Sequence, residues 1–474
     1  MNVALSKTAA LARPVPRLAP ATVDRTPWTL PVVGGGVLLL LLGAAAFYVS
    51  PKFGLAALGL PALPLLVLYP AHALLVFVAA MPFDAVAALL PDRTLSLTRL
   101  LGIGVLAAWG VWVLVNRVRV RLSAPGLLLL GYVAFAALSF FWADNAEATR
   151  TQLRTLAQLF LLYLVTANLV SHLPSLERTL NVLIAATALL GLLVLWQLPS
   201  AGASRATFTY GEQSFNPNYL AAALVMPAVA AVALGRARGP FGWWRLLAVV
   251  PICAGIVASG SRGGIVGLVA GMAVLALARP RLGVRAAGVV VLLLLALPLV
   301  LPASMLDQLV ARFTEAGSDR LSGRLDIWKV AFAMIGDRPF QGTGFACFRD
   351  AFYRYMATAG VDPHWALQNS WGGRVAHNVY LGTLAELGVV GLALLLGAFT
   401  AHGLGALRAW RHARATGDAY LGVLALALLC MLASFLVFAN SIDFMMRKNP
   451  WVMLGMIQGL LLTLDRNGLG ALRR

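Results

Sequence analysis

Long apolar runs recur along almost the whole chain, and they decide what it can fold into. A bilayer core of about 30 Å needs about 17–25 consecutive apolar residues in each helical span. About fourteen runs meet this need, and a count of twelve is also compatible because several runs are short. Since the bilayer offers the backbone no water, each span must satisfy its own hydrogen bonds as a helix. The sequence therefore predicts an all-α polytopic membrane protein with about 12–14 transmembrane helices, at residues 31–49, 53–69, 71–90, 97–115, 125–141, 151–170, 177–197, 217–234, 244–259, 262–278, 284–301, 377–401, 418–439 and 450–464.

Composition supports this fold class and indicates which connections lie on the cytoplasmic side of the membrane. Of the 474 residues, 60% are hydrophobic and only 12% are charged, which excludes an ordinary soluble protein. By the positive-inside rule, the face that holds the basic connections is cytoplasmic, so both termini are expected in the cytoplasm. The net charge of +19 is then a topology signal and indicates no nucleic-acid partner. With fourteen spans the basic clusters all fall on this face: Lys7, Arg13, Arg17 and Arg25; Arg117, Arg119 and Arg121; Arg236, Arg238 and Arg245; Arg279, Arg281 and Arg285; Arg408, Arg411 and Arg414; Arg466, Arg473 and Arg474.

The connections divide the chain into four parts. Residues 1–30 carry several Pro and Arg and are expected to form a disordered cytoplasmic leader. Residues 31–301 form a bundle of transmembrane spans, and residues 377–474 supply the C-terminal transmembrane helices. The connection between them, residues 302–376, is too long for a tight turn and too short for an ordinary independent domain. The three cysteines have neither the pairing of a disulfide framework nor the spacing of a metal site.

The long connection, residues 302–376, has a helical pattern. In "SGRLDIWKVAFAMIGDRPF" apolar residues recur at helical spacing after Ser322, a suitable N-cap. A second helix is expected in "FACFRDAFYRYMATAG", where Phe348, Phe352 and Tyr355 share one face. This aromatic load suits a helical lid lying on the outer membrane interface.

Three arginines stand out among those on the outer face, where the positive-inside rule expects few. They are Arg205 in a short outer loop, Arg262 at the start of a span and Arg324 at the start of the first lid helix. Small residues surround Arg262 in "SGSRGGIVG", so backbone amides and a guanidinium could converge there on one anion. A charge at membrane depth indicates function, and the alternative is a side chain that snorkels to headgroup phosphates.

Polar residues mark two further span starts on the same face. Asn216-Pro217-Asn218 is a turn followed by a helix start, and we expect both asparagines to line a site there. His377 and Asn378 stand at the mouth of a long apolar run. This position suits a general base with an orienting neighbour, or only an interfacial helix cap.

Three motifs, in their order along the chain, resemble a known family. They are the outer loop with Arg205 and Asn-Pro-Asn, the Ser-Arg-Gly-Gly span start, and a late long loop. That loop opens "GRLDIWKVAFAMIGDRPFQGTGF" and closes "AHNVYLGTLAELGVVGL". Over roughly residues 205–391 the chain resembles the O-antigen ligase and polymerase superfamily of bacterial inner-membrane glycosyltransferases.

The resemblance implies a GT-C-type fold in the bacterial inner membrane with a periplasmic active site. Such enzymes move a glycan from undecaprenyl pyrophosphate to an acceptor hydroxyl, with inversion and with neither metal nor cofactor. Ligases deliver it to the lipid A core of lipopolysaccharide, and polymerases join lipid-linked units of O-antigen or exopolysaccharide. The family's loop-opening Arg and loop-closing His fall on Arg324 and His377, and its span-mouth Arg falls on Arg262. Some ligases carry a second His where this chain has Val375, which leaves the acceptor class open.

The chemistry of these residue types agrees with the resemblance. Arginine presents a planar fork that matches phosphate oxygens, which suits Arg262 and Arg324 to a leaving pyrophosphate. A neutral His377 can accept the proton of an acceptor hydroxyl. The predicted catalytic residues are therefore His377, Arg324 and Arg262, and the predicted substrate-binding residues are Arg205, Asn216, Asn218 and Asn378. The outer loops contain no Asp-x-Asp pair, which favours a site without a metal.

Two other classes of function remain as alternatives. A polytopic transporter of an anion or glycan would also need charges in its spans, but it often shows paired repeats and broken helices near the midplane. The sequence shows no convincing repeat, and its arginines lie at the outer edge of the spans. The third possibility is a membrane scaffold without catalysis.

Overall fold

The computed structural model describes residues 69–86, 96–197, 209–210, 213–214, 216–235, 242–282, 288, 307, 323–362 and 374–466. The expected leader and span 31–49 lie outside these residues, as do spans 53–69 and 284–301 apart from single positions. Arg205 also lies outside them.

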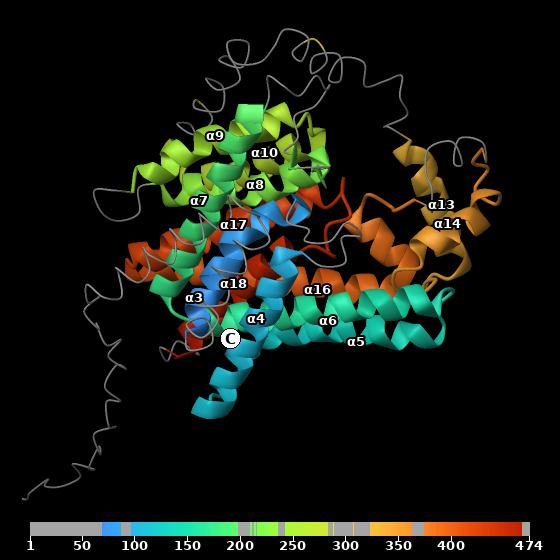
Figure 1. Cartoon of the computed structure of the whole chain (residues 1–474), viewed down its shortest axis with the longest axis horizontal. Helices are drawn as coiled ribbons and strands as arrows, with labels where there is room; N and C mark the ends of the chain where they lie inside the picture. Colours follow the sequence, from blue (N-terminus) through green and yellow to red (C-terminus); the bar gives the residue numbers. More distant parts are fainter. Residues whose placement is uncertain are drawn as a thin grey trace, which may run out of the picture. The chain divides into compact units, whose positions relative to one another are not determined.

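Every expected span within the described residues is helical (Figure 1). Six helices are long and apolar enough to cross a membrane by length and composition: Leu97–Asn116, Ala124–Phe141, Leu173–Gln197, Pro217–Leu234, Val379–Thr416 and Ala419–Phe438. The chain is thus a multi-pass membrane protein by its helix composition. One two-residue pair of strands, β1 (Thr209–Tyr210) and β2 (Gln213–Ser214), interrupts the otherwise helical structure. The α-helices are α3 (Pro70–Ala80), α4 (Leu97–Asn116), α5 (Ala124–Leu138), α6 (Ala146–Leu169), α7 (Leu173–Gln197), α8 (Pro217–Leu234), α9 (Trp244–Ala258), α10 (Arg262–Ala278), α13 (Arg324–Asp337), α14 (Phe348–Met356), α16 (Val379–Thr416), α17 (Ala419–Phe438) and α18 (Lys448–Arg466), and the 3-10 helices are η1 (Met81–Val86) and η2 (Ser139–Phe141).

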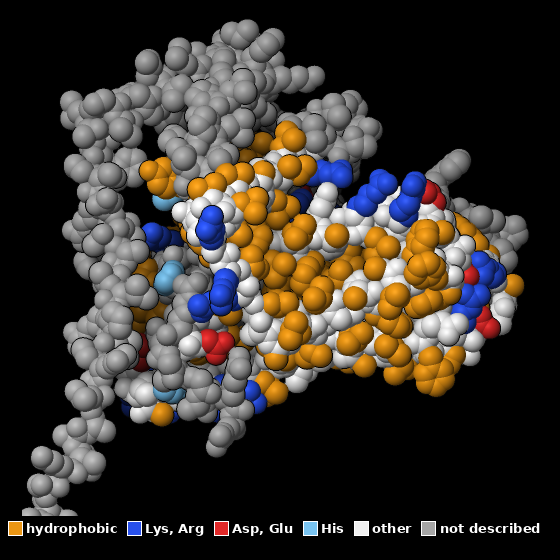
Figure 2. Space-filling view, turned by 90° about the horizontal axis from the view of Figure 1, so that it is seen from below, with side chains coloured by type: hydrophobic (Ala, Val, Ile, Leu, Met, Phe, Trp, Pro, Cys, Tyr) orange, Lys and Arg blue, Asp and Glu red, His pale blue; other side chains and the backbone are white. Residues whose placement is uncertain are grey.

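Helices α8 and α17 form the centre of the bundle. They pack against each other, and α17 also packs against α10 and α16 (Figure 1). Both are apolar on all sides and mostly buried, as expected for helices enclosed by other helices. Hydrophobic side chains cover much of the outward surface in Figure 2, with charged side chains toward its edges. Such a surface suits contact with lipid.

One basic residue of the predicted cytoplasmic clusters is in fact internal. Arg245 is only 4% exposed, and its guanidinium lies 2.6 Å from the carboxylate of Glu177. It also donates to Asn181 and to the Leu234 carbonyl, and Tyr420 donates to Glu177. The burial of Arg245 does not test the side of the membrane on which this residue lies, which stays a prediction. Arg245 holds α7, α8, α9 and α17 together, because a buried charge must be paired and fully hydrogen-bonded.

Helix α16 is broken near its start. Gly388 has a φ of 63° and a ψ of −167°, a conformation that is essentially restricted to glycine. The turns that follow α13 pack at the break: Thr343 donates to the Ala385 carbonyl at 3.1 Å, and Gly344 donates to the Glu386 carbonyl at 2.9 Å. On the other side of the break, Val389 donates to the Pro339 carbonyl at 2.8 Å. The lid is therefore joined to the span that follows it, because the break leaves backbone groups that the lid satisfies.

The break predicts a large stability difference between two glycines of the same helix. Gly388→Ala would force a disfavoured φ and place a Cβ against the Phe340 carbonyl, whereas a Cβ at Gly397 would meet Leu128 only at 3.8 Å. We expect Gly388→Ala to lower the free energy of unfolding by at least about 1–3 kcal/mol. Gly397→Ala should leave the free energy of unfolding almost unchanged. Thermal unfolding in detergent, followed by size-exclusion recovery, measures both. Equal melting temperatures for the two variants would contradict the presence of a break in α16 at Gly388.

The two lid helices pack on each other through the aromatic face predicted for α14. Phe348, Phe352 and Tyr355 are buried against Ile327 and Met334 of α13. The prediction of one aromatic face is confirmed, but that face turns into the lid and does not lie against a membrane interface. The expected cap at Ser322 is wrong by one residue: α13 begins at Arg324, with Gly323 at the N-cap in a left-handed conformation with a φ of 75°.

Candidate active site

Three helix ends meet where the candidate residues lie. Gly263, next to Arg262, packs so closely on the end of α17 that a Cβ would collide with Ser441 Oγ. Val379, at the start of α16, donates its N–H to the Ala439 carbonyl at 2.8 Å. The N-termini of α10 and α16 thus flank the C-terminal end of α17, which brings Arg262 and the His377 segment to one place although they are far apart in sequence.

The lid brings Arg324 to the same place. Trp328, one turn after Arg324 in α13, donates from Nε1 to the carbonyl of Ala376 at 3.1 Å. Arg324 is half-buried, and burial together with the charge of Arg262 lowers its pKa. An arginine keeps its charge even so, because its unperturbed pKa is above about 12. The guanidinium groups of Arg262 and Arg324 therefore lie near each other. Among the described residues, neither of them forms an ion pair or hydrogen bond with a carboxylate.

His377 is held in a fixed backbone conformation between two anchored neighbours. Its φ of 49° lies in the left-handed region, which few residues other than glycine adopt. Ala376 before it is hydrogen-bonded to Trp328, and Asn378 after it caps α16. Backbone strain of this kind persists only where the surroundings impose it, and it is common at active sites.

The electrostatic environment of His377 favours the neutral imidazole. Burial, followed by the charges of Arg324 and Arg374, lowers its pKa to about 4. Both causes act in the same direction and favour the proton-accepting form of the imidazole. The larger cause, burial, was not foreseen, and neither was Arg374.

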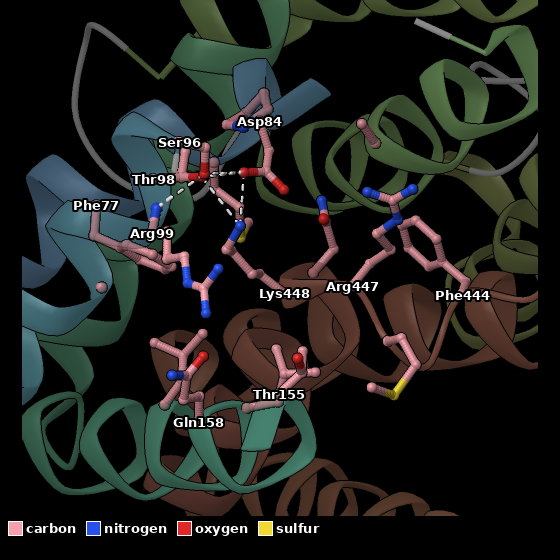
Figure 3. A pocket seen from close by; sticks show the side chains of 18 of the residues that line it. Phe77, Asp84, Ser96, Thr98, Arg99, Thr155, Gln158, Phe444, Arg447 and Lys448 are labelled. Atoms are coloured by element: carbon pink, nitrogen blue, oxygen red, sulfur yellow. Dashed lines mark hydrogen bonds and ion pairs between the residues drawn. The ribbon is translucent and has the colours of Figure 1, made fainter. Parts of the chain in front are cut away.

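The predicted substrate-binding asparagines have structural roles in this arrangement. The Asn378 Oδ1 accepts from the N–H groups of Tyr380 at 3.0 Å and Leu381 at 3.1 Å. The Asn216 Oδ1 accepts from the N–H of Asn218 at 2.9 Å and caps α8. A Cβ at Gly264 of α10 would collide with the Cβ of Ala221, so the first turn of α8 lies against α10. Asn216 lines a different cavity, of about 560 Å³ (Figure 3), and its binding role stays a prediction.

A cavity of about 570 Å³ adjoins the His377 segment. Ala376 and Val379, which flank that segment, line one wall of it. The other walls combine Arg349 and apolar side chains such as Phe348 with carboxylates and amides, among them Asn145, Glu147, Gln152, Asp350 and Asp443. Such side chains hydrogen-bond well to the hydroxyl groups of sugars.

Glu386 of α16 is hydrogen-bonded to the lid. Its carboxylate accepts from the N–H of Ala346 at 3.0 Å and of Phe348 at 3.1 Å, at the start of α14. A carboxylate at a helix N-terminus is stabilised by the unpaired N–H groups there. Glu386 therefore fixes α14 to α16 two turns beyond His377, and it shapes the cavity that it lines.

Two residues near the site were missed. Arg374 acts electrostatically on His377 from three positions before it, and Trp328 fixes the lid helix to the His377 segment. Arg374 could have been found, since it is a further arginine on the face where arginines are unexpected. Trp328 gave no such signal, because a Trp in an amphipathic helix is usually a packing residue.

Comparison with family models gives one match. Residues 246–396 match a family model described as O-Antigen ligase, named Wzy_C. This part of the chain is similar to an O-antigen ligase domain. The matched range spans α9 and α10, the lid and the start of α16, and so contains Arg262, Arg324 and His377. The match makes the chain similar, over these residues, to a family of glycan ligases and polymerases.

Comparisons of the whole chain with curated proteins and with solved structures add no argument about its function. No curated protein matches the chain. One solved structure, described as "Structural coordination of polymerization and crosslinking by a peptidoglycan synthase complex", is 19% identical and covers 72% of this chain and 97% of its own. Its TM-score of 0.37 is too low to support an argument about this fold.

Proposed function

We propose that this protein is an O-antigen ligase-like glycosyltransferase. It transfers a glycan from undecaprenyl pyrophosphate to a hydroxyl of the lipid A core at the periplasmic side of the bacterial inner membrane, with inversion and without a metal. The observation that carries the proposal is the convergence of Arg262, Arg324 and His377 at the meeting point of α10, α13, α16 and α17. Transfer from a purified lipid pyrophosphate donor onto defined acceptors tests it.

The roles of the residues follow from the bonds that change. The acceptor oxygen forms a new bond to the anomeric carbon of the glycan while the bond from that carbon to the pyrophosphate oxygen breaks. Arg262 and Arg324 neutralise the charge that develops on the departing pyrophosphate. His377 Nδ1 or Nε2 accepts the proton of the acceptor hydroxyl, and attack from the face opposite the leaving group gives inversion.

The acceptor glycan is assigned to the 570 Å³ cavity beside His377. Its carboxylates and amides accept hydrogen bonds from sugar hydroxyls, while the arginines remain for the donor phosphates. Val375 lines this cavity at the position where some ligases carry a second His. Polymerisation of O-antigen or exopolysaccharide units is therefore the second candidate function, and an assay with lipid-linked glycan acceptors beside lipid A core acceptors separates the two.

The topology is part of the proposal. Arg262, Arg324 and His377 lie at helix ends that the fourteen-span reading puts outside, with both termini in the cytoplasm and the lid over residues 302–376 in the periplasm. Labelling of introduced cysteines in intact cells tests this: Lys329→Cys in the lid should react with an impermeant reagent, and Arg408→Cys should not. The reverse result would place the site on the cytoplasmic face.

Metal removal gives a direct test of the leaving-group chemistry. Two arginines can supply the positive charge that a divalent cation supplies in other sugar transferases. We expect the initial rate of transfer to be unchanged after EDTA treatment. A loss of rate that added magnesium or manganese restores would contradict the assignment.

A further inference from the structure

Exposed apolar side chains gather where the lid joins the membrane-spanning helices. Phe340, in the turns that follow α13, is 70% exposed, and Phe141, at the end of η2, is 82% exposed. Val389 and Val390, directly after the break in α16, are exposed as well. We call these four side chains the lid-foot patch, and residues 339–341 the lid turn. The patch combines three segments that are distant in the sequence.

Hydrogen bonds hold the lid turn between α16 and the segment after α5. On one side, Val389 donates to the Pro339 carbonyl at 2.8 Å. On the other side, Trp142 donates from Nε1 to the Gln341 carbonyl at 3.1 Å. Phe340 stands between these two anchors, so its backbone is fixed beside the start of the apolar part of α16 although its side chain is exposed.

The length of α16 beyond the break fits the apolar core of a bilayer. Residues 389–407 contain no Asp, Glu, Lys or Arg, and the exposed Arg408 follows them. At 1.5 Å per residue this stretch is about 28 Å long, which matches the thickness of the bilayer core. With Arg408 at one boundary of the core, the break and the lid turn lie at the other boundary.

Helix α5 places the same boundary at its C-terminal end. It packs against α16, and a Cβ at Gly131 would meet Leu394 at 3.3 Å. Leu394 is six residues after Gly388, so the break is level with the residues about six positions after Gly131. Leu138 lies at that level with an exposed side chain, and Phe141 follows within one turn. Phe141 and the lid turn therefore lie at similar depth.

Charged side chains begin directly outside this level on both segments. Asp144, three residues after Phe141, pairs with Arg338 at 2.9 Å and with Arg354 at 3.0 Å. Arg338 in turn stands two residues before Phe340. A change from exposed aromatic side chains to ion pairs within a few residues is typical of the boundary between membrane and water.

We propose that the lid-foot patch is inserted into the leaflet nearest the candidate active site, in direct contact with lipid chains. The patch continues without a change in composition into the exposed apolar sides of α5 and α16, which include Leu130 and Leu396. Lipid covers both parts of this surface, whereas a protein partner would have to stop at a boundary that the side chains do not show. Since the lid turn follows α13, the contact also fixes the depth of Arg324 in the membrane. It is independent of the proposed reaction.

Spin labels measure this contact directly. Phe340→Cys and Phe141→Cys are labelled with a nitroxide in the full chain and reconstituted in liposomes of phosphatidylethanolamine and phosphatidylglycerol. Collisions with oxygen, which concentrates in lipid, are compared with collisions with the nickel complex NiEDDA, which stays in water. The ratio of oxygen to nickel collisions should be at least about fivefold higher for both labels than for Lys329→Cys, because a polar complex is excluded from the apolar core.

Two reference positions bracket the expected result. Lys329→Cys, on the exposed side of α13, reports water, and Leu396→Cys, on the exposed side of α16, reports lipid. The three cysteines of the chain are buried, and the chain without an introduced cysteine gives the background signal. A label at Phe340→Cys with the collision ratio of Lys329→Cys overturns the proposal. A label shielded from both reagents also overturns it, because that result would show a protein surface on the patch.

Photocrosslinking in native membranes identifies the partner. Phe340→benzoylphenylalanine should form an adduct with the added mass of a phospholipid, as should the same substitution at Leu396, and the same substitution at Lys329 should form none. A cross-link from position 340 to another protein or to a second copy of this chain overturns the proposal. An adduct at position 396 without one at position 340 does so as well. Melting temperatures confirm that each variant folds.

Discussion

Arg324→Ala and Arg262→Ala should each reduce the transfer rate by about 10²–10³-fold or more, because each removes a preorganised charge from the departing pyrophosphate. The effect should fall on the chemical step as well as on donor binding, since charge on the leaving group is largest in the transition state. Arg324→Lys and Arg262→Lys should restore little, because an ammonium group lacks the planar fork. Initial rates with purified enzyme and a lipid pyrophosphate donor measure all four variants.

A control for these variants lies on the same lid helix. Lys329 is a basic residue of α13 that is about half-exposed and paired with Asp326 at 2.7 Å. Lys329→Ala should keep near-normal transfer and the same yield in the membrane as the arginine variants. If the arginine variants were as active as Lys329→Ala, neither arginine would act on the donor and the donor-site assignment would fail.

Much of the fold follows from the sequence because a bilayer permits few solutions. An apolar run of sufficient length must be a helix, so most of the described spans coincide with the apolar runs within a few residues, whereas α16 continues to Thr416, well beyond the expected end at residue 401. The helices of the lid follow from the same periodicity that applies to soluble proteins. Arg262, Arg324 and His377 could be chosen because charged and titratable groups are unexpected at span starts on the outer side.

The details that assemble the site could not be predicted, because they depend on contacts between distant segments. The break at Gly388 exists only because the segment around Thr343 supplies its hydrogen bonds. A glycine in a helical run is usually tolerated without a break, so nothing in the sequence indicates a break at this position. The buried ion pair of Arg245 with Glu177 is another such detail, because it joins two helices that are distant in the sequence.

His377→Gln should lower the transfer rate by about 10²-fold or more, because glutamine keeps hydrogen-bonding ability but accepts no proton. Donor binding should persist, since Arg262 and Arg324 remain. A matched control is Asn378→Asp, which preserves a side-chain oxygen at the N-cap of α16 and should retain folding. If His377→Gln kept a near-normal rate, the residue would serve only to shape the start of α16.

The pH dependence of the wild-type enzyme tests the same role without a mutation. The base must be neutral to work, so the rate should rise with pH through the pKa of His377 and then stay flat. Burial and the charges of Arg324 and Arg374 hold that pKa at about 4 in the free enzyme. The titration of His377 should therefore leave kcat/KM independent of pH from about pH 5 upward. A bound pyrophosphate brings negative charge toward the same arginines, which favours the imidazolium and raises the pKa of His377. The pH range over which kcat rises should therefore be higher than the range over which kcat/KM rises.

Arg374→Gln should also move the rise of kcat/KM to higher pH, because it removes one of the charges that lower the pKa of His377. A limb near pH 6.5 for kcat/KM in both the wild type and Arg374→Gln would show that His377 is not the base in this environment.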